Sequence, residues 1–285
     1  MKLANLTSEV YVPDGTPVEE AMARATHMGV GAHQDDIEVI ALHGVLECFG
    51  KSDMHFMGVT VTNGSGSPRD GLYAHYTDEQ MMAVRRVEQK KAAVIGEYCA
   101  HAFLDYPSSA IKGPANTNAI SDLKAILLAA RPKVIYTHNL ADKHDTHVAV
   151  ALRLIRAIRE LPKDARPNRL LGCEVWRDLD WTNDEDKVVL NVQAHENLAA
   201  ALIGVFDSQI CGGKRYDLAM AGRRRANATL FASHGVDEST ALMFAVDLTP
   251  LVTDDTLDPH DYIRGYIDRF AADVASRIAN LTWFA

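Results

Sequence analysis

The sequence carries a short polar cluster, Ala32-His33-Gln34-Asp35-Asp36, directly after an apolar run and before a helical pattern. Zinc takes imidazole and carboxylate ligands readily, and catalytic zinc sites use three protein ligands while leaving a position for water. His33 and Asp36, three residues apart at a strand-to-helix turn, can converge on one ion. Asp35 and Asp36 are adjacent, so in a first helical turn their side chains diverge by about 100°. Without a distorted backbone only one can ligate, which gives Asp36 to the metal and leaves Asp35 beside the water as general base.

These aspartates could instead simply cap the helix expected at Ile37–Phe49, because Asp is favoured at helix N-termini. A second cluster, His144-Asp145-Thr146-His147, weighs against that interpretation. Its two histidines are three residues apart at the start of another helix, so both imidazoles lie on one face. One can be the third ligand, and the other can lie near the water and the developing oxyanion. Together the two clusters indicate a metal-dependent hydrolase.

Short apolar runs alternate with helical patterns, which is typical of βαβ units. We predict a Rossmann-like α/β fold, a mostly parallel sheet with helices on both faces. The expected strands are His27–Ala32, His55–Thr62, Ala102–Tyr106, Lys133–Thr137 and Arg169–Trp176, with a later one at Leu242–Val246. The expected helices are Ile37–Phe49, Asp78–Tyr98, Thr117–Ala130, His147–Glu160, Val192–Phe206 and Pro259–Ile278. Both polar clusters follow strands, and ligands of such sheets bind beyond the carboxyl ends of the strands.

Composition narrows the class of protein. The net charge of −9 argues against a nucleic-acid surface or a polybasic membrane contact. Four cysteines without CxxC pairing suit a reducing compartment, and no apolar leader or 18-residue apolar stretch occurs. We therefore expect a cytoplasmic protein without nucleic-acid or membrane partners. A homo-oligomer is compatible with the sequence.

Other polar features leave alternatives open. The turn-rich segment 62–71 predicts either a surface loop or a substrate-facing loop. Arg223-Arg224-Arg225 could hold a phosphate or carboxylate, or form a solvated basic face. Trp176, Arg177 and Trp181 follow the fifth strand, so Arg177 is predicted to contact substrate. The tryptophans could stack on a sugar ring or pack in the core.

With these residues the sequence resembles the LmbE-like, or PIG-L, zinc-dependent de-N-acetylases. Ala32–Asp36, with Glu38 two residues on, is similar to their Ala-His-Pro-Asp-Asp-Glu motif, and Asp142–His147 resembles their His-x-Asp-His motif. Arg85–Glu88 followed by Phe103–Pro107 resembles the intervening pattern. The likeness spans roughly residues 27 to 210 and implies one such domain over residues 1–285.

Carried over position by position, the resemblance implies His33, Asp36 and His147 as zinc ligands and Asp35 as base. It implies that His144 stabilises the oxyanion or serves as acid, and that Arg85 lines the substrate pocket.

The sequence departs from that pattern in three places. Gln34 replaces a proline, the aspartate of the second motif comes one place early as Asp145, and Phe206–Gln209 stands where many relatives have His-x-Ser-Gln. If the family's carboxylate orients a histidine, Asp142 or Asp145 must take that role. The metal chemistry is retained, while the pocket wall differs.

We expect a zinc-dependent hydrolase that removes an N-acetyl or other N-acyl group from an amino sugar or a small amino-sugar conjugate. Zinc lowers the pKa of bound water towards about 7, Asp35 takes its proton, and protonated His144 helps to hold the oxyanion. The alternatives are a zinc hydratase or lyase acting on a small organic acid on the same scaffold, and a non-catalytic carbohydrate-binding protein.

Overall fold

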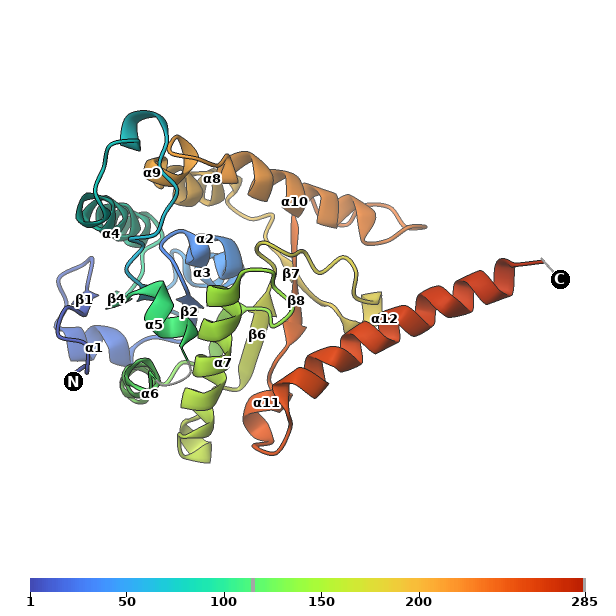
Figure 1. The fold of residues 1–285 in the computed structure, drawn as a ribbon, viewed down its shortest axis with the longest axis horizontal. Coiled ribbons are helices and arrows are strands. Elements are labelled where there is room, and N and C mark those ends of the chain that lie inside the picture. Colours follow the sequence, from blue (N-terminus) through green and yellow to red (C-terminus); the bar gives the residue numbers. More distant parts are fainter. Residues whose placement is uncertain (114–115, 284–285) are drawn as a thin grey trace.

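The protein is described by a computed structural model covering residues 1–113 and 116–283, and it is built on one mixed sheet (Figure 1). The strand order is β1-β4-β3-β2-β5-β6-β8-β7. The five strands from β4 to β6 run parallel, whereas β1 and β8 pair antiparallel with their neighbours and β7 pairs antiparallel with β8. The strands are β1 Glu9–Tyr11, β2 His27–Gly31, β3 Phe56–Thr62, β4 Ala100–Tyr106, β5 Val134–His138, β6 Arg169–Cys173, β7 Val188–Asn191 and β8 Leu242–Asp247. This is the predicted α/β class.

Helices cover both faces of the sheet, as expected. They are α1 Val18–Ala23, α2 Asp36–Ile40, α3 Leu42–Cys48, α4 Asp78–Ile95, α5 Ser108–Lys112, α6 Asn118–Ala130, α7 Asp145–Arg159, α8 Glu196–Gly204, α9 Asp207–Ile210, α10 Tyr216–Leu230, α11 Pro250–Thr253 and α12 Pro259–Leu281. The helix expected at Ile37–Phe49 is divided at Ala41, whose φ of −115° is not helical. Sequence reasoning missed α10, the short helices α1, α5, α9 and α11, and the short strands β1 and β7.

Two hydrophobic clusters explain why the layers hold together. The central strands are buried on both faces, and every residue of β3 is buried. One cluster packs α1, α6, α7 and α11 against one face of the sheet. The other packs α2, α3, α8 and the end of α4 against the opposite face. Strands buried on both faces favour continuous apolar runs, which is why these strands were visible in the sequence.

The strand order places the two polar clusters side by side. The chain builds outwards from β2 through β3 to β4, then returns to place β5 on the other side of β2. The carboxyl ends of β2 and β5 therefore flank a topological switch point, where ligands of doubly wound sheets bind. His33 lies just beyond β2, and His138 is the last residue of β5. No helix within residues 1–113 and 116–283 is both long and apolar enough to cross a bilayer.

Candidate metal centre and active site

The turn after β2 separates the two adjacent aspartates by a local distortion. Asp35 has a φ of 93°, in the left-handed region that non-glycine residues rarely adopt, and α2 begins at Asp36. Such a backbone costs on the order of 1–3 kcal/mol and persists only where surrounding contacts hold it. Asp36 Oδ2 accepts the His33 backbone N–H at 2.7 Å, and the Asp35 N–H donates to Gln89 Oε1 at 3.2 Å. The distortion does not recruit both carboxylates to one ion: Asp35 turns towards Arg85.

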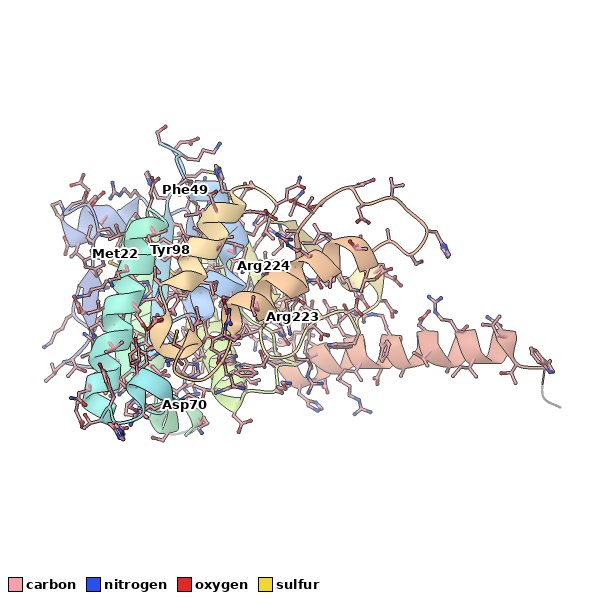
Figure 2. The ribbon with its side chains drawn as sticks, turned by 90° about the horizontal axis from the view of Figure 1, so that it is seen from above. Met22, Phe49, Asp70, Tyr98, Arg223 and Arg224 are labelled. Atoms are coloured by element: carbon pink, nitrogen blue, oxygen red, sulfur yellow. The ribbon has the colours of Figure 1, made fainter. Side chains whose placement is uncertain are left out.

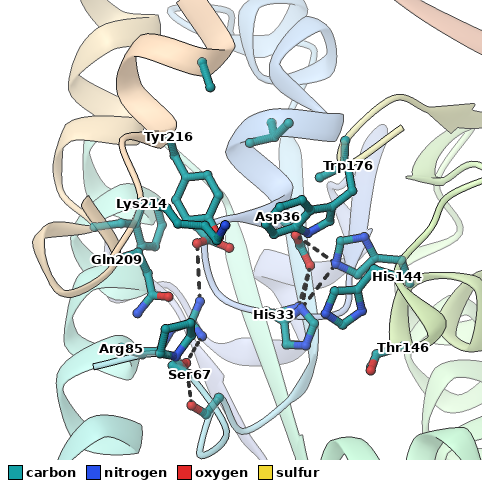
Figure 3. Close-up of a pocket in the computed structure, with 18 of the residues that line it drawn as sticks. His33, Asp36, Ser67, Arg85, His144, Thr146, Trp176, Gln209, Lys214 and Tyr216 are labelled. Carbon is teal, nitrogen blue, oxygen red and sulfur yellow. Dashed lines mark hydrogen bonds and ion pairs between the residues drawn. The ribbon is translucent and has the colours of Figure 1, made fainter. Parts of the chain in front are cut away.

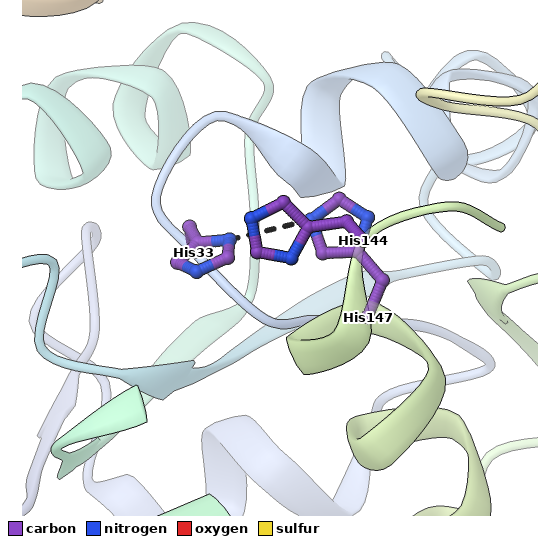
Figure 4. A group of neighbouring side chains, drawn as sticks. All are labelled: His33, His144 and His147. Carbon is purple, nitrogen blue, oxygen red and sulfur yellow. Dashed lines mark hydrogen bonds between the residues drawn. The ribbon is translucent and has the colours of Figure 1, made fainter. Parts of the chain in front are cut away.

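Three donor groups come together at the switch point, from His33, Asp36 and His147. Figure 3 labels His33 and Asp36, and Figure 4 shows His147 beside His33 and His144. His33 Nδ1 lies 3.3 Å from Asp36 Oδ2 and 3.3 Å from His147 Nε2. His147 Nε2 lies 3.4 Å from Asp36 Oδ1. Donors bound at about 2.0–2.1 Å around a tetrahedral zinc are separated by about 3.3–3.4 Å. Each of the three separations matches that value, with one oxygen of Asp36 facing each histidine, and imidazole and carboxylate are ligands that zinc accepts.

Asp142 lies next to Nδ1 of His147, the ring nitrogen that does not belong to the donor set. Its Oδ2 lies 3.4 Å from His147 Nδ1, and its two oxygens also accept the backbone N–H groups of His144 and Trp176. A carboxylate on the far nitrogen of a histidine fixes the tautomer that leaves the other nitrogen free to ligate. Burial alone would lower the pKa of His147, but the Asp36 and Asp142 carboxylates outweigh burial and raise it. Of the two aspartates left open by the sequence, Asp142 serves the ligand His147.

His138 is a site residue that sequence reasoning missed, although it directly follows a predicted strand. Its fully buried ring stacks on His147 with centroids 3.9 Å apart, and its Nε2 lies 3.4 Å from Asp36 Oδ2. Asp36, His138 and His147 thus form a second conceivable donor set. However, His138 Nε2 accepts the Ala32 backbone N–H at 2.9 Å. Because this bond occupies the lone pair that a metal would need, the geometry favours His33 over His138.

His144 lies beside this donor set, and with His33 and His147 it forms a third conceivable set of metal ligands (Figure 4). Its ring stacks on His147 at 4.4 Å and lies 5.1 Å from the His33 ring. Among the residues that the structure describes, nothing hydrogen-bonds to the buried His144 Nδ1. Burial, followed by the charge of His147, lowers the pKa of His144. The structure therefore favours a neutral imidazole here, whereas the sequence interpretation used a protonated one.

Asp35 and Arg85 form the other half of the site. Arg85 is almost fully buried on α4, and its Nη2 lies 3.4 Å from Asp35 Oδ2. The guanidinium also donates to Ser67 Oγ and to the Gln34 carbonyl. Burial raises the pKa of Asp35 to about 8, and the Arg85 charge opposes that rise. A carboxyl whose pKa is raised in this way is suited to proton transfer.

The pKa of Asp36 shifts in the opposite direction to that of Asp35. Burial alone would raise its pKa, but the neighbouring histidines hold it well below its usual value. Two adjacent carboxylates with pKa values pushed apart are suited to different roles. The sequence predicts Asp36 as the ligand and Asp35 as the base, and this assignment stays a prediction.

A cavity of about 790 Å³ opens over these groups. Gly64, Gly66, Ser67 and Pro68 line it, so the turn-rich loop faces the cavity. The opposite wall comes from α8 to α10 and the loops between them, with Trp176 beside them. Further lining residues are His33, Asp35, Asp36, Val39, Arg85, Ser108, Lys112, His144, Thr146, His147, Val175, Ile203, Phe206, Gln209, Ile210, Lys214, Arg215, Tyr216, Ala219, Met220 and Arg223.

Several residues singled out from the sequence lie elsewhere. Arg177 is exposed and does not line the cavity, so the predicted substrate contact is not supported. Trp181 packs against Phe270 instead, with ring centroids 6.2 Å apart. The arginine run on α10 is divided. Arg223 lines the cavity, and Arg224 is buried and donates to the Glu38 carbonyl (Figure 2 labels both arginines). Arg225 pairs with Glu196. The run is therefore neither a single anion site nor a solvated face.

Part of the chain matches a known family, and several solved structures have a similar fold. Residues 28–158 match the PIG-L family, described as GlcNAc-PI de-N-acetylase. No curated protein matches the chain.

Solved structures with the same fold include GalB, a 4-carboxy-2-hydroxymuconate hydratase from Pseudomonas putida, with a TM-score of 0.59, 16% identity, and coverage of 78% of this chain and 95% of that one. The N,N'-diacetylchitobiose deacetylase from Pyrococcus horikoshii has a TM-score of 0.58 and 15% sequence identity. The match covers 80% of this chain and 87% of the deacetylase. A deacetylase of the teicoplanin biosynthesis pathway has a TM-score of 0.56 and 13% sequence identity. The match covers 78% of this chain and 98% of the deacetylase.

Proposed function

Residues 28–158 of this chain belong to the PIG-L family, and from that premise we propose that the protein is a zinc-dependent hydrolase that removes an N-acetyl or other N-acyl group from an amino sugar or a small amino-sugar conjugate. One observation carries the proposal: the donor triangle of His33, Asp36 and His147, with Asp35 beside it, at the base of a cavity. The deacetylases with the same fold support it.

His33 Nδ1, the Asp36 carboxylate and His147 Nε2 would hold the metal. When bound, zinc would polarise the acyl carbonyl and make water more acidic. Asp142 keeps His147 in the ligating tautomer. Proton transfer and stabilisation of the oxyanion are carried out by residues that are not ligands.

Asp35, when ionised, takes a proton from the water that attacks the acyl carbon. Arg85 favours the ionised form, because its charge opposes the effect of burial on the Asp35 pKa. His144 donates a hydrogen bond to the oxygen on which negative charge develops. The C–N bond then breaks, and Asp35 returns its proton to the leaving amine. The products are a carboxylate, acetate for an acetyl substrate, and a free amine.

The test measures acetate release from N-acetylglucosamine, N-acetylgalactosamine and N,N'-diacetylchitobiose, with metal content determined on the same sample. We expect release by zinc-loaded protein, loss of release after chelation, and recovery on adding zinc back. His147→Ala should lose most of the zinc and the activity together. Zinc-loaded protein that releases acetate from no N-acetyl amino sugar contradicts the proposal.

A hydratase is the second candidate, because GalB has this fold. The two reactions differ in product: hydrolysis releases acetate and an amine, whereas hydration adds water across a carbon–carbon double bond. Loss of the ultraviolet absorbance of an unsaturated dicarboxylate, without acetate release from any amide, would favour the hydratase.

A further inference from the structure

The peptide group between Gln34 and Asp35 is held at both of its polar ends. Its carbonyl, on Gln34, accepts a hydrogen bond from the Arg85 guanidinium. Its N–H, on Asp35, donates to Gln89 Oε1 at 3.2 Å. Arg85 and Gln89 are four residues apart on α4, so both side chains leave one face of the helix, one turn apart. Helix α4 therefore fixes the plane of this peptide group.

The plane of this peptide group sets the backbone conformation of Asp35. The φ of Asp35 is 93°, and a non-glycine residue keeps such a value only where surrounding contacts hold it. Rotating the peptide plane would turn the Asp35 N–H away from Gln89 and change this φ. The Asp35 carboxylate, whose Oδ2 lies 3.4 Å from Arg85 Nη2, would then move out of its place. Gln89 thus acts on the position of the carboxylate through the backbone.

The amide of Gln89 is in turn held in one of its two orientations. Its Nε2 donates to Glu38 Oε1 at 2.7 Å, and the Tyr98 hydroxyl donates to the same oxygen at 2.8 Å. The reversed amide would set its NH₂ group against the Asp35 N–H and its oxygen against the Glu38 oxygen, and both contacts are repulsive. Gln89 and Glu38 are fully buried and Tyr98 is 2% exposed. In such surroundings an unpaired polar group is costly, so the amide keeps the orientation that accepts from Asp35.

A different hydrogen bond holds the ligand side of the same turn. The His33 N–H donates to Asp36 Oδ2 at 2.7 Å, and both residues belong to the proposed zinc ligands. The turn therefore has two supports, one on its ligands and one on its base. Loss of the Gln89 amide should release Asp35 and leave the ligand side in place.

We propose that Gln89, oriented by Glu38 and Tyr98, is a positioning residue that holds the Asp35 carboxylate where it meets the attacking water. This inference rests on the proposed function, because it concerns the base of that reaction. Gln89 lies outside both polar clusters of the sequence, on a helix more than fifty residues from Asp35 along the chain. Displacing a catalytic group by about 1 Å can cost about 10²-fold in rate, so the effect is expected in kcat.

Amide hydrogen exchange of the zinc-loaded chain, followed by nuclear magnetic resonance, tests this support without a substrate. Gln89→Met keeps the length of the side chain and removes both hydrogen-bonding groups. The Asp35 N–H should then exchange about tenfold or more faster than in the native protein, because its partner is lost. The His33 N–H is the internal reference, and its exchange should stay unchanged.

The double variant Glu38→Gln with Gln89→Glu keeps the experiment decisive if Gln89→Met fails to fold. The new carboxylate at position 89 can accept from the Asp35 N–H. The new amide at position 38 can donate one hydrogen to that carboxylate and the other to the Tyr98 hydroxyl oxygen. The polar groups are thus paired again, and the Asp35 N–H should exchange as slowly as in the native protein.

Three results would overturn the inference. The first is unchanged exchange of the Asp35 N–H in Gln89→Met. The second is equally faster exchange at His33, which would show that the whole turn has loosened. The third is fast exchange at Asp35 in the double variant, because its paired groups should restore the support.

Turnover separates this inference from the proposed function. Gln89→Met should lose about 10–10²-fold in kcat for acetate release, with KM and zinc content little changed. Gln193→Met, the same change at an exposed glutamine, should leave all three at the native values. A native kcat in Gln89→Met would overturn the inference and leave the hydrolase standing. Native protein that releases no acetate would refute the hydrolase, while the exchange measurement still tests the support of Asp35 by Gln89.

Discussion

Replacing Asp142 by Asn should weaken zinc binding without removing a ligand. Asp142 Oδ2 lies 3.4 Å from His147 Nδ1, where a carboxylate can only accept and so keeps the proton on Nδ1. An amide can turn its NH₂ group to that nitrogen, which moves the imidazole proton to Nε2 and blocks ligation. Losing such a partner typically costs 10–100-fold in metal affinity, or about 1.4–2.7 kcal/mol.

The same variant should show a characteristic pH dependence. Burial tends to lower the pKa of His147, and the Asp36 and Asp142 carboxylates raise it. Removing the Asp142 charge lowers that pKa, so protons compete less with the metal in the variant than in the native protein. The affinity deficit should therefore be largest near about pH 8 and narrow towards about pH 6.

Competition with a chromophoric chelator at several pH values measures both effects. Asp145→Asn is the matched control, because Asp145 is exposed and one residue from His144. An affinity deficit independent of pH would show that Asp142 acts only through the loop backbone. Equal losses in the two variants would refute the assignment of Asp142 to His147.

Four further outcomes are expected. Asp35→Asn should keep its zinc and lose about 10²–10⁴-fold in kcat, measured as acetate release, and retained turnover would remove Asp35 from the mechanism. Arg85→Met should raise the pKa of Asp35 and move the acid limb of the kcat/KM profile to higher pH; an unmoved limb would assign the base elsewhere. His144→Ala should keep its zinc and lose about 10²-fold in kcat, and a smaller loss would exclude a direct contact with the oxyanion. Burial lowers the pKa of His101 to about 3, so stability should fall as pH drops from about 6.5 towards 3, and His101→Gln should flatten that fall in urea unfolding of the metal-free protein.

Much of the site was visible in the sequence because each cluster is local. His33 and Asp36 lie within one turn after a strand, and His144 and His147 lie within one turn at the start of a helix. Short-range geometry therefore restricts which side chains can converge. The six apolar runs predicted as strands were recognisable because strands buried on both faces have few polar positions. The short strands β1 and β7 lack that signal.

The tertiary structure decided what depends on long-range placement. Whether His33 or His138 faces the metal position depends on β5 lying beside β2 and on the hydrogen bond from Ala32 to His138. Asp142 reaches His147 because of the path of the loop after β5, which no periodicity encodes.

The cavity wall formed by α8, α9 and α10 follows from how these helices pack over the sheet. That packing brings Arg223 to the cavity, while Arg177, beyond β6, is left exposed outside it. The sequence by itself determined the types of donor and their local spacing. Only the packing of segments distant along the chain decided which donors meet and what surrounds them, because those contacts depend on strand order and loop paths rather than on neighbouring residues.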